Sequence, residues 1–245
     1  MRVDVCFDGN AYAALKLAKN VFRLDLPHVE LLCDDLTFGS LADMSFDVRS
    51  RELSRLHVDP SFLCERSSRE FPLRVEAADE LRLWSTGKPS DVLGEYYVAS
   101  LAPQGVPISH IEVDAEGVLQ DIDAAGAAMR ELLASACPLD ASRMREIWRR
   151  MLADDASLRV VVDGMPASRD VTYFDCALRE LATHGNFESS SDLAIAALDS
   201  CAALAGGPIN LEFYRGRAGS LGCSPRADRF VYDGEDEPAS RERLL

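Results

Sequence analysis

Residues 33–39, with the sequence Cys-Asp-Asp-Leu-Thr-Phe-Gly, bring together side chains that could do chemistry. Asp34 and Asp35 follow an apolar run, and Gly39 closes the segment. Two adjacent acids repel each other unless one accepts hydrogen bonds or holds a ligand. The pair therefore indicates either a solvated turn or the rim of a catalytic site. In a site, Asp35 would act as general base or metal ligand and Asp34 as its partner. The cofactor stays unassigned, with Mg²⁺ as a candidate because a divalent cation would relieve the repulsion.

The elements that must position these acids begin with a predicted βαβ unit. Residues 3–7 are β-branched and aromatic, which predicts a strand that Asp8-Gly9-Asn10 breaks. Residues 11–22 carry apolar side chains at helical spacing, and residues 29–33 predict the second strand. Two strands joined by a helix are normally parallel with a right-handed crossover. The acidic pair is therefore expected just past the carboxyl end of the second strand.

A second predicted βα unit follows, and after it the sequence pattern changes from alternating strands and helices to mainly helices. Residues 81–87 predict a strand closed by Gly87, and the next helix has Pro89 near its first turn. From about residue 120 the pattern is mainly helical. We expect an α/β fold with a Rossmann-like or flavodoxin-like, mostly parallel sheet and flanking helices, and a smaller, mainly helical C-terminal domain. The expected divisions are 1–118 for the α/β domain with a ligand site, 119–232 for the helical domain and 233–245 for an acidic tail.

Ligands of open parallel sheets bind outside the carboxyl ends of the strands. The residues expected at that edge are Gly9, Asn10, Asp34, Asp35, Gly39, Trp84 and Ser85. Asp, Asn, Ser and Gly are also the residues that any βα turn prefers, so a purely structural role is the alternative.

Three arginines in residues 49–55 follow the acidic segment. Arg49, Arg51 and Arg55 could neutralise the acids, and Arg51 or Arg55 could bind a ligand's phosphate or carboxylate. The alternative is a solvated, charged helix face. His57, which follows directly, could fold over the acidic turn.

Composition narrows the class of protein. The chain has 245 residues, with 26 Lys and Arg against 41 Asp and Glu, which gives a net charge of −15. That charge repels the phosphate backbone and disfavours nucleic acid as a partner. The seven cysteines show no zinc-site or Cys-x-x-Cys spacing. The N-terminus lacks a signal-peptide pattern and no apolar stretch is long enough to span a membrane. We expect a soluble, cytoplasmic protein with no membrane contact.

Several segments together resemble a bacterial family. The segments are "FDGNAYAALK", "CDDLTFGSL", "LRLWSTG", "IWRRMLADDASLRVVVDG" and "TYFDCALREL". In this order they resemble domain of unknown function 1835 followed by its companion domain 3658. The chain departs from the family at Ser40, where relatives carry Pro, and at residues 8–10, where they carry Gly-Asp-Ser. The resemblance implies a shared site at Gly9, Asn10, Asp34, Asp35 and Gly39 and a winged-helix character for the C-terminal domain. It implies no particular reaction.

Two functions from different classes remain open. In the first, the protein binds or acts on a small anionic metabolite or nucleotide at the carboxyl ends of its strands. In the second, it is a non-catalytic regulator that docks protein or nucleic acid through its C-terminal domain. The basic concentration Arg215, Arg217, Arg226 and Arg229 supports the nucleic-acid version of the second. A scaffold protein, a protein partner or a second copy of the chain are further alternatives.

Overall fold

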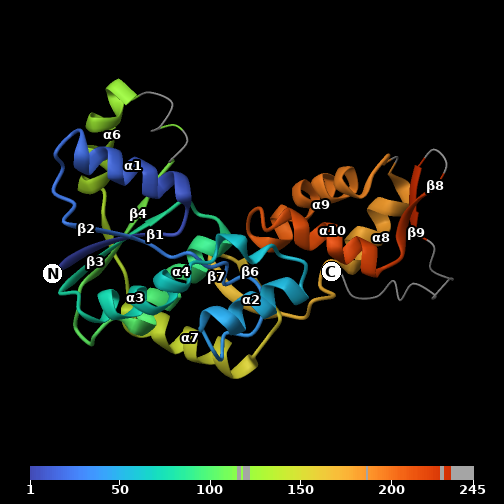
Figure 1. Ribbon diagram of the computed structural model, residues 1–245, viewed down its shortest axis with the longest axis horizontal. Helices are drawn as coiled ribbons and strands as arrows, with labels where there is room; N and C mark the ends of the chain where they lie inside the picture. Colours follow the sequence, from blue (N-terminus) through green and yellow to red (C-terminus); the bar gives the residue numbers. More distant parts are fainter. Residues whose placement is uncertain (115–116, 118–121, 186, 227–228, 233–245) are drawn as a thin grey trace.

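The computed structural model describes residues 1–114, 117, 122–185, 187–226 and 229–232. Figure 1 shows a sheet with helices on both faces and, beside it, a second group made of α8, α9 and α10 with a terminal hairpin. The expected acidic tail, 233–245, lies outside the described residues. In the described part of the chain, no helix is both long and apolar enough to cross a bilayer.

The central sheet confirms the expected α/β architecture. Its strand order is β2-β1-β3-β4-β5. The first four strands pair in parallel, and the short β5 pairs antiparallel with β4. Parallel strands with both faces covered read as continuous apolar runs, and β1 has four buried residues in a row. The bounds are β1 Arg2–Cys6, β2 His28–Leu31, β3 Glu80–Ser85, β4 Ile108–Glu112 and β5 Cys137–Pro138.

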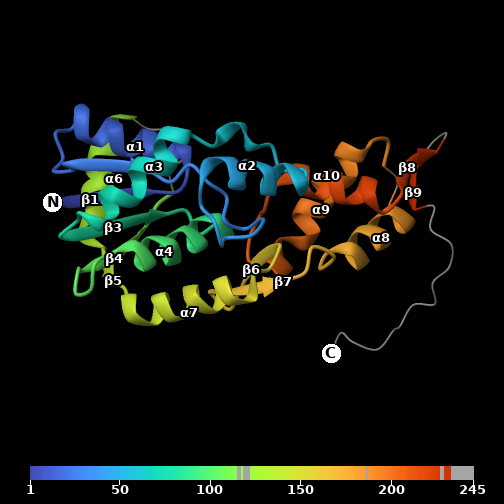
Figure 2. The same ribbon diagram turned by 60° about the horizontal axis from the view of Figure 1, so that its bottom comes forward.

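Five helices in the described part of the chain cover the sheet, and alternate residues of each strand point to opposite faces. On one face, Cys6 and Trp84 pack with α1 (Gly9–Asn20) and α6 (Ile122–Ala134). On the other, Val5 and Leu83 belong to a core shared with three helices. These are α3 (Glu65–Glu76), α4 (Pro89–Leu101) and α7 (Ala141–Asp154). Figure 2 shows α7 running alongside α4.

The segment between β2 and β3 breaks at Pro60, as the sequence predicts. It forms α2 (Phe46–Arg55), a 3₁₀ turn at Pro60–Phe62 and then α3. Pro fixes its own φ and disfavours a helical conformation in the residue before it, which separates the two helices.

The C-terminal part has its own core, which also includes residues of the N-terminal segment. Phe38 packs against Phe213 with tilted rings whose centroids are 4.9 Å apart, and Leu53 of α2 belongs to the same cluster. The elements are β6 (Leu158–Val162), β7 (Met165–Arg169), α8 (Asp175–His184), α9 (Ser190–Ala205), α10 (Leu211–Ser220), β8 (Cys223–Arg226) and β9 (Arg229–Tyr232).

The elements α6, β5 and α7, which follow the expected division between residues 118 and 119, pack against or extend the central sheet. Residue 117 is described but residues 118–121 are not, so the boundary itself lies outside the described residues. The helices α6 and α7 bury their apolar faces against the central sheet, and β5 extends it. Their helical periodicity shows that each has a face to bury but not which surface covers it.

One ion pair joins β4 to α4 and makes stability depend on pH. His110 Nδ1 lies 2.6 Å from Glu95 Oε1, and the hydrogen bond that the imidazole donates to this carboxylate raises the pKa of His110 from its ordinary value of 6.5. The protonated imidazole therefore stabilises the fold at pH values below 6.5, and this contribution is lost as the pH rises through the folded-state pKa. We expect the urea midpoint of the wild type to decrease as the pH is raised from 6 to 8. In His110→Gln this pH dependence of the midpoint should be smaller. An equal change of the urea midpoint with pH in the two proteins would contradict this assignment.

Candidate functional site

Asp34 lies past the carboxyl end of β2, as expected, but both of its carboxylate oxygens are bound by Arg49. Arg49 Nε donates to Oδ2 at 2.8 Å and Nη2 to Oδ1 at 3.0 Å. The guanidinium also donates to the carbonyls of Ser40, Asp35 and Phe38 at 2.8–3.0 Å. The Arg49 side chain is 1 % exposed. Of the two alternatives for the arginines, neutralisation of the acids is therefore what Arg49 does, and the Asp34–Asp35 pair offers poor coordination for Mg²⁺.

A second buried arginine holds the same segment from the other side. Arg159 of β6 donates from Nη1 to the carbonyl of Leu36 at 2.9 Å and from Nη2 to the carbonyls of Gly39 and Ala156. Its backbone N–H donates to the carbonyl of Thr37 at 2.8 Å. Burial lowers the pKa of Arg159 to about 10, so the side chain stays charged at pH 7. Residues 34–40 therefore wrap around two guanidinium groups.

Gly39 is required by this wrapping. Its φ is +75°, and a Cβ at this position would lie 2.7 Å from Glu52 Cβ. Its N–H donates to the carbonyl of Ser157 at 2.9 Å. The geometry explains the glycine by backbone conformation and close packing, without a ligand.

Asp35 is placed differently from Asp34. Its Oδ1 accepts from the Thr37 N–H at 3.1 Å, and the residue lines a cavity of about 250 Å³ with Thr37, Lys88, Ser90 and Asn210. Burial raises the pKa of Asp35, against the hydrogen bonds from Thr37 that lower it. A carboxylate with a raised pKa beside a cavity is a candidate acid or base.

A further cavity lies at the point where the chain changes direction across the sheet. After β2 the chain returns to the opposite side of β1 to form β3, and α1 and α4 leave toward opposite faces. Such a switch point leaves a crevice outside the carboxyl ends of the two strands. Here the crevice holds a cavity of about 310 Å³. Its polar lining is Asp8, Asn10, Thr86, Lys88, Glu112 and Asp114.

Lys88 joins the two sides of this crevice. Its Nζ lies 2.8 Å from Asp8 Oδ2, across the switch point, and its side chain is 42 % exposed. Lys88 lines both cavities, which places it between Asn10 and Asp114 on one side and Asp35 on the other. Lys88 therefore places one positive charge in the lining of both cavities, whose other charged residues are acidic.

The starts of α1 and α4 already contain carboxylates of the chain. Asp8 Oδ1 accepts from the N–H groups of Asn10 and Ala11 at 2.8 and 3.2 Å. Burial opposes its ionisation, but the hydrogen bonds from Lys88 and the helix start outweigh burial and lower the pKa of Asp8. Buried Asp91 accepts from the N–H and Oγ1 of Thr86 at 2.8 and 2.7 Å, and burial raises its pKa. The two loops are thus preorganised around the crevice.

The structure brings some predicted site residues together and separates others. Asn10 lines the large cavity, and Gly9 is the first residue of α1 beside it. Trp84 is fully buried on the sheet face, where its Nε1 donates to Asp4 at 2.9 Å. Ser85 is also buried and accepts from the Gly87 N–H at 3.2 Å. Neither side chain lines the two crevice cavities.

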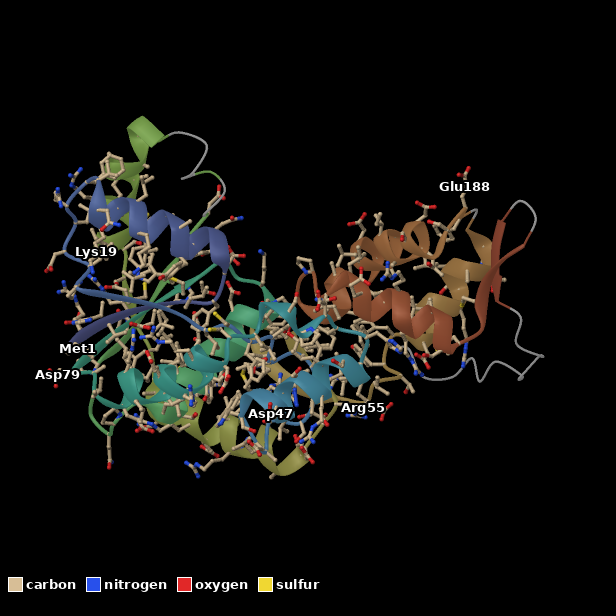
Figure 3. The ribbon with its side chains drawn as sticks, in the orientation of Figure 1. Met1, Lys19, Asp47, Arg55, Asp79 and Glu188 are labelled. Carbon is tan, nitrogen blue, oxygen red and sulfur yellow. The ribbon has the colours of Figure 1, made fainter. Side chains whose placement is uncertain are left out.

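Arg51 and Arg55 do not reach the acidic segment. Arg51 is exposed on α2. Arg55 lies at the end of that helix nearer to the C-terminal helices, as Figure 3 shows, and contributes to another cavity. Sequence reasoning missed Lys88, Arg159 and Asn210 as parts of this region. For Lys88 a signal was present, since it stands between a strand-ending glycine and a helix-starting proline and is one of three lysines in the chain.

Metal binding has no preformed cluster here. Across the described ranges, no three His, Cys, Asp or Glu side chains are grouped so that they could hold a metal ion. The seven cysteines, all of which lie in those ranges, form no disulfide bond there.

The chain was compared with models of protein families and with curated proteins. No family model matches the chain, and a search of curated proteins also gave no match.

Proposed function

We propose that the protein binds a small metabolite with an anionic group, such as a nucleotide, in the crevice outside the carboxyl ends of β1, β3 and β4. The observation that carries the proposal is the cavity of about 310 Å³ at the switch point of the sheet, with Lys88 in its lining. A flavodoxin-like strand order with a site at this point would fit the resemblance to the family named above.

The charges of the crevice suggest how such a ligand would lie. Lys88 would receive the anionic group, because it is a cation that lines both crevice cavities. Glu112 and Asp114 also line the cavity and would accept hydrogen bonds from hydroxyl groups, as acidic residues do with a ribose. A ligand with both kinds of group fits this lining better than a bare anion.

Asp35, rather than Asp34, is the carboxylate available for chemistry. Arg49 takes both oxygens of Asp34, whereas Asp35 borders a cavity that contains Lys88. If the protein is an enzyme, Asp35 would act as its general acid or base. The free thiols fit a reducing compartment, and we propose the cytoplasm.

A thermal-shift screen with nucleotides and small phosphorylated or carboxylated metabolites tests this proposal. A ligand at 100 times its dissociation constant adds about 2.7 kcal/mol. That gain should raise the melting temperature by about 5–11 °C for a chain of this size. We expect Lys88→Met to weaken binding about 10- to 100-fold, because it removes a charged donor.

Lys19→Met is the matched control, since Lys19 lies at the far end of α1 (Figure 3). Asp35→Asn tests the chemical role separately. If the protein is an enzyme, we expect this variant to bind ligand and lose turnover. A ligand whose affinity is unchanged by Lys88→Met would contradict the proposed site.

The second candidate function is docking through the C-terminal part. Three helices followed by the β8–β9 hairpin would make a winged-helix-like module, which would serve a regulator. Two of the four arginines in its basic concentration are already engaged, since Arg215 pairs with Glu212 and Arg217 with Asp175. A duplex oligonucleotide that binds at low salt, and no longer binds the Arg215→Ala/Arg217→Ala variant, would favour this function. No binding at low salt would exclude its nucleic-acid form.

A further inference from the structure

A cavity of about 180 Å³ lies between the end of α2 and α10, away from the crevice. Its polar lining is Arg55, His57, Arg217 and Ser220, and its apolar wall includes Val171 and Phe213. Among the described residues that line it there is no carboxylate, whereas both crevice cavities contain at least one. In a chain with a net charge of −15, two arginines and a histidine around one small cavity are a local exception.

Each of the two arginines is held by an ion pair with a carboxylate that does not line the cavity. Arg217 uses Nε and Nη2 to bind both oxygens of Asp175 at 2.6 Å, and the Asp175 side chain is 8 % exposed. Arg55 uses Nη2 to bind Glu52 at 2.9 Å. A guanidinium has five N–H groups, so each arginine keeps donors that these contacts do not use.

The backbone conformation of His57, which follows the end of α2, is unusual for a residue other than glycine. The Val58 N–H donates to the carbonyl of Leu53 at 3.0 Å and the His57 N–H to that of Ser54 at 3.1 Å. This is the Schellman pattern, in which the residue at position 57 is left-handed and usually glycine. His57 has a φ of +62°. A residue whose backbone is kept in a strained conformation often marks a functional site.

The imidazole lies directly against α10. A Cβ at Gly216 would be 2.2 Å from His57 Cγ, so the glycine makes room for the ring. The close approach brings His57 beside the helix that also carries Arg217 and Ser220. The two elements therefore form the cavity together, although they lie far apart in the sequence.

We propose that this cavity is a second ligand site, which binds a phosphate group. Arginine forks match the oxygens of phosphate, and His57 supplies a further donor. The Ser220 hydroxyl already donates to the carbonyl of Gly216 at 3.0 Å, so Ser220 only lines the cavity. The volume is below the roughly 300 Å³ at which sites for whole drug-sized ligands begin, so the cavity suits one small anionic group. The site is separate from the proposed crevice site and does not depend on it.

Titration calorimetry of the full chain with inorganic phosphate at low ionic strength tests the proposal. We expect Arg55→Gln to weaken phosphate binding about tenfold, because a charged donor is lost. Arg51→Gln, an exposed change on the same helix, should leave the affinity unchanged. Lys88→Met should also leave it unchanged, which separates this site from the crevice. Tighter binding of phenyl phosphate than of inorganic phosphate would assign the site to phosphomonoesters, and equal affinity would assign it to phosphate itself.

His57→Gly provides a variant that is expected to fold. Glycine suits the left-handed conformation, so the melting temperature should be at least that of the wild type, while phosphate affinity should fall about two- to tenfold. Three results would overturn the proposal. They are no binding of phosphate by the wild type, unchanged affinity in both Arg55→Gln and His57→Gly, or loss of binding in Lys88→Met alone.

Discussion

Replacing Arg49 with methionine should lower the free energy of unfolding by about 3–5 kcal/mol, because the change leaves a poorly solvated carboxylate without its partner. Asp34 would lose both hydrogen bonds, and the carbonyls of Ser40, Asp35 and Phe38 would lose a donor. Urea unfolding followed by circular dichroism measures the effect. The unfolding slope should stay close to that of the wild type if the folded state is otherwise retained.

Arg51→Met is the matched control on the same helix. Arg51 is exposed, so the change should stay within about 0.5 kcal/mol. Asp34→Asn tests the partner and should also destabilise the protein, since Arg49 is 1 % exposed. A change below about 1 kcal/mol in Arg49→Met would show that the pair contributes little. Lost turnover with unchanged stability in Asp34→Asn would instead make Asp34 a catalytic residue.

Replacing Arg159 with methionine should destabilise the protein by about 2–4 kcal/mol, because two buried carbonyls and one half-buried carbonyl lose their donor. The acceptors are the carbonyls of Leu36, Gly39 and Ala156. Two effects oppose the loss. Methionine removes a buried charge, and it removes the Arg159 Nε, which has no hydrogen-bond partner within the described structure. We expect the three lost bonds to outweigh both, since methionine fills the space without satisfying any carbonyl.

Hydrogen exchange adds a local measure to the unfolding experiment. The Gly39 N–H donates to Ser157, so its exchange should speed up in Arg159→Met if the guanidinium holds the segment in place. The control is Arg150→Met, because the Arg150 side chain is 69 % exposed and pairs only with Glu146 on its own helix. Unchanged stability and unchanged exchange at Gly39 would show that β6 alone holds residues 34–40.

The sequence by itself determined the local elements of the sheet. The apolar run at residues 3–7, the break at Asp8-Gly9 and the helical spacing that follows predict β1 and α1, which the structure confirms. The strand near Leu81, the helix after Pro89 and the break at Pro60 were predicted for the same reason. Periodicity, glycine and proline act on neighbouring residues, so a local pattern is enough to read them.

Only the tertiary structure decided which charges meet. Asp34 and Asp35 are identical neighbours in the sequence, yet one is bound by Arg49 and the other borders a cavity. Arg159 reaches Leu36 across 123 residues, and no spacing rule connects them. Lys88 meets Asp8 because β1 and β3 are neighbours in the sheet. A charged side chain can pair with any opposite charge that packing brings near, and packing is set by buried apolar faces rather than by the charges themselves.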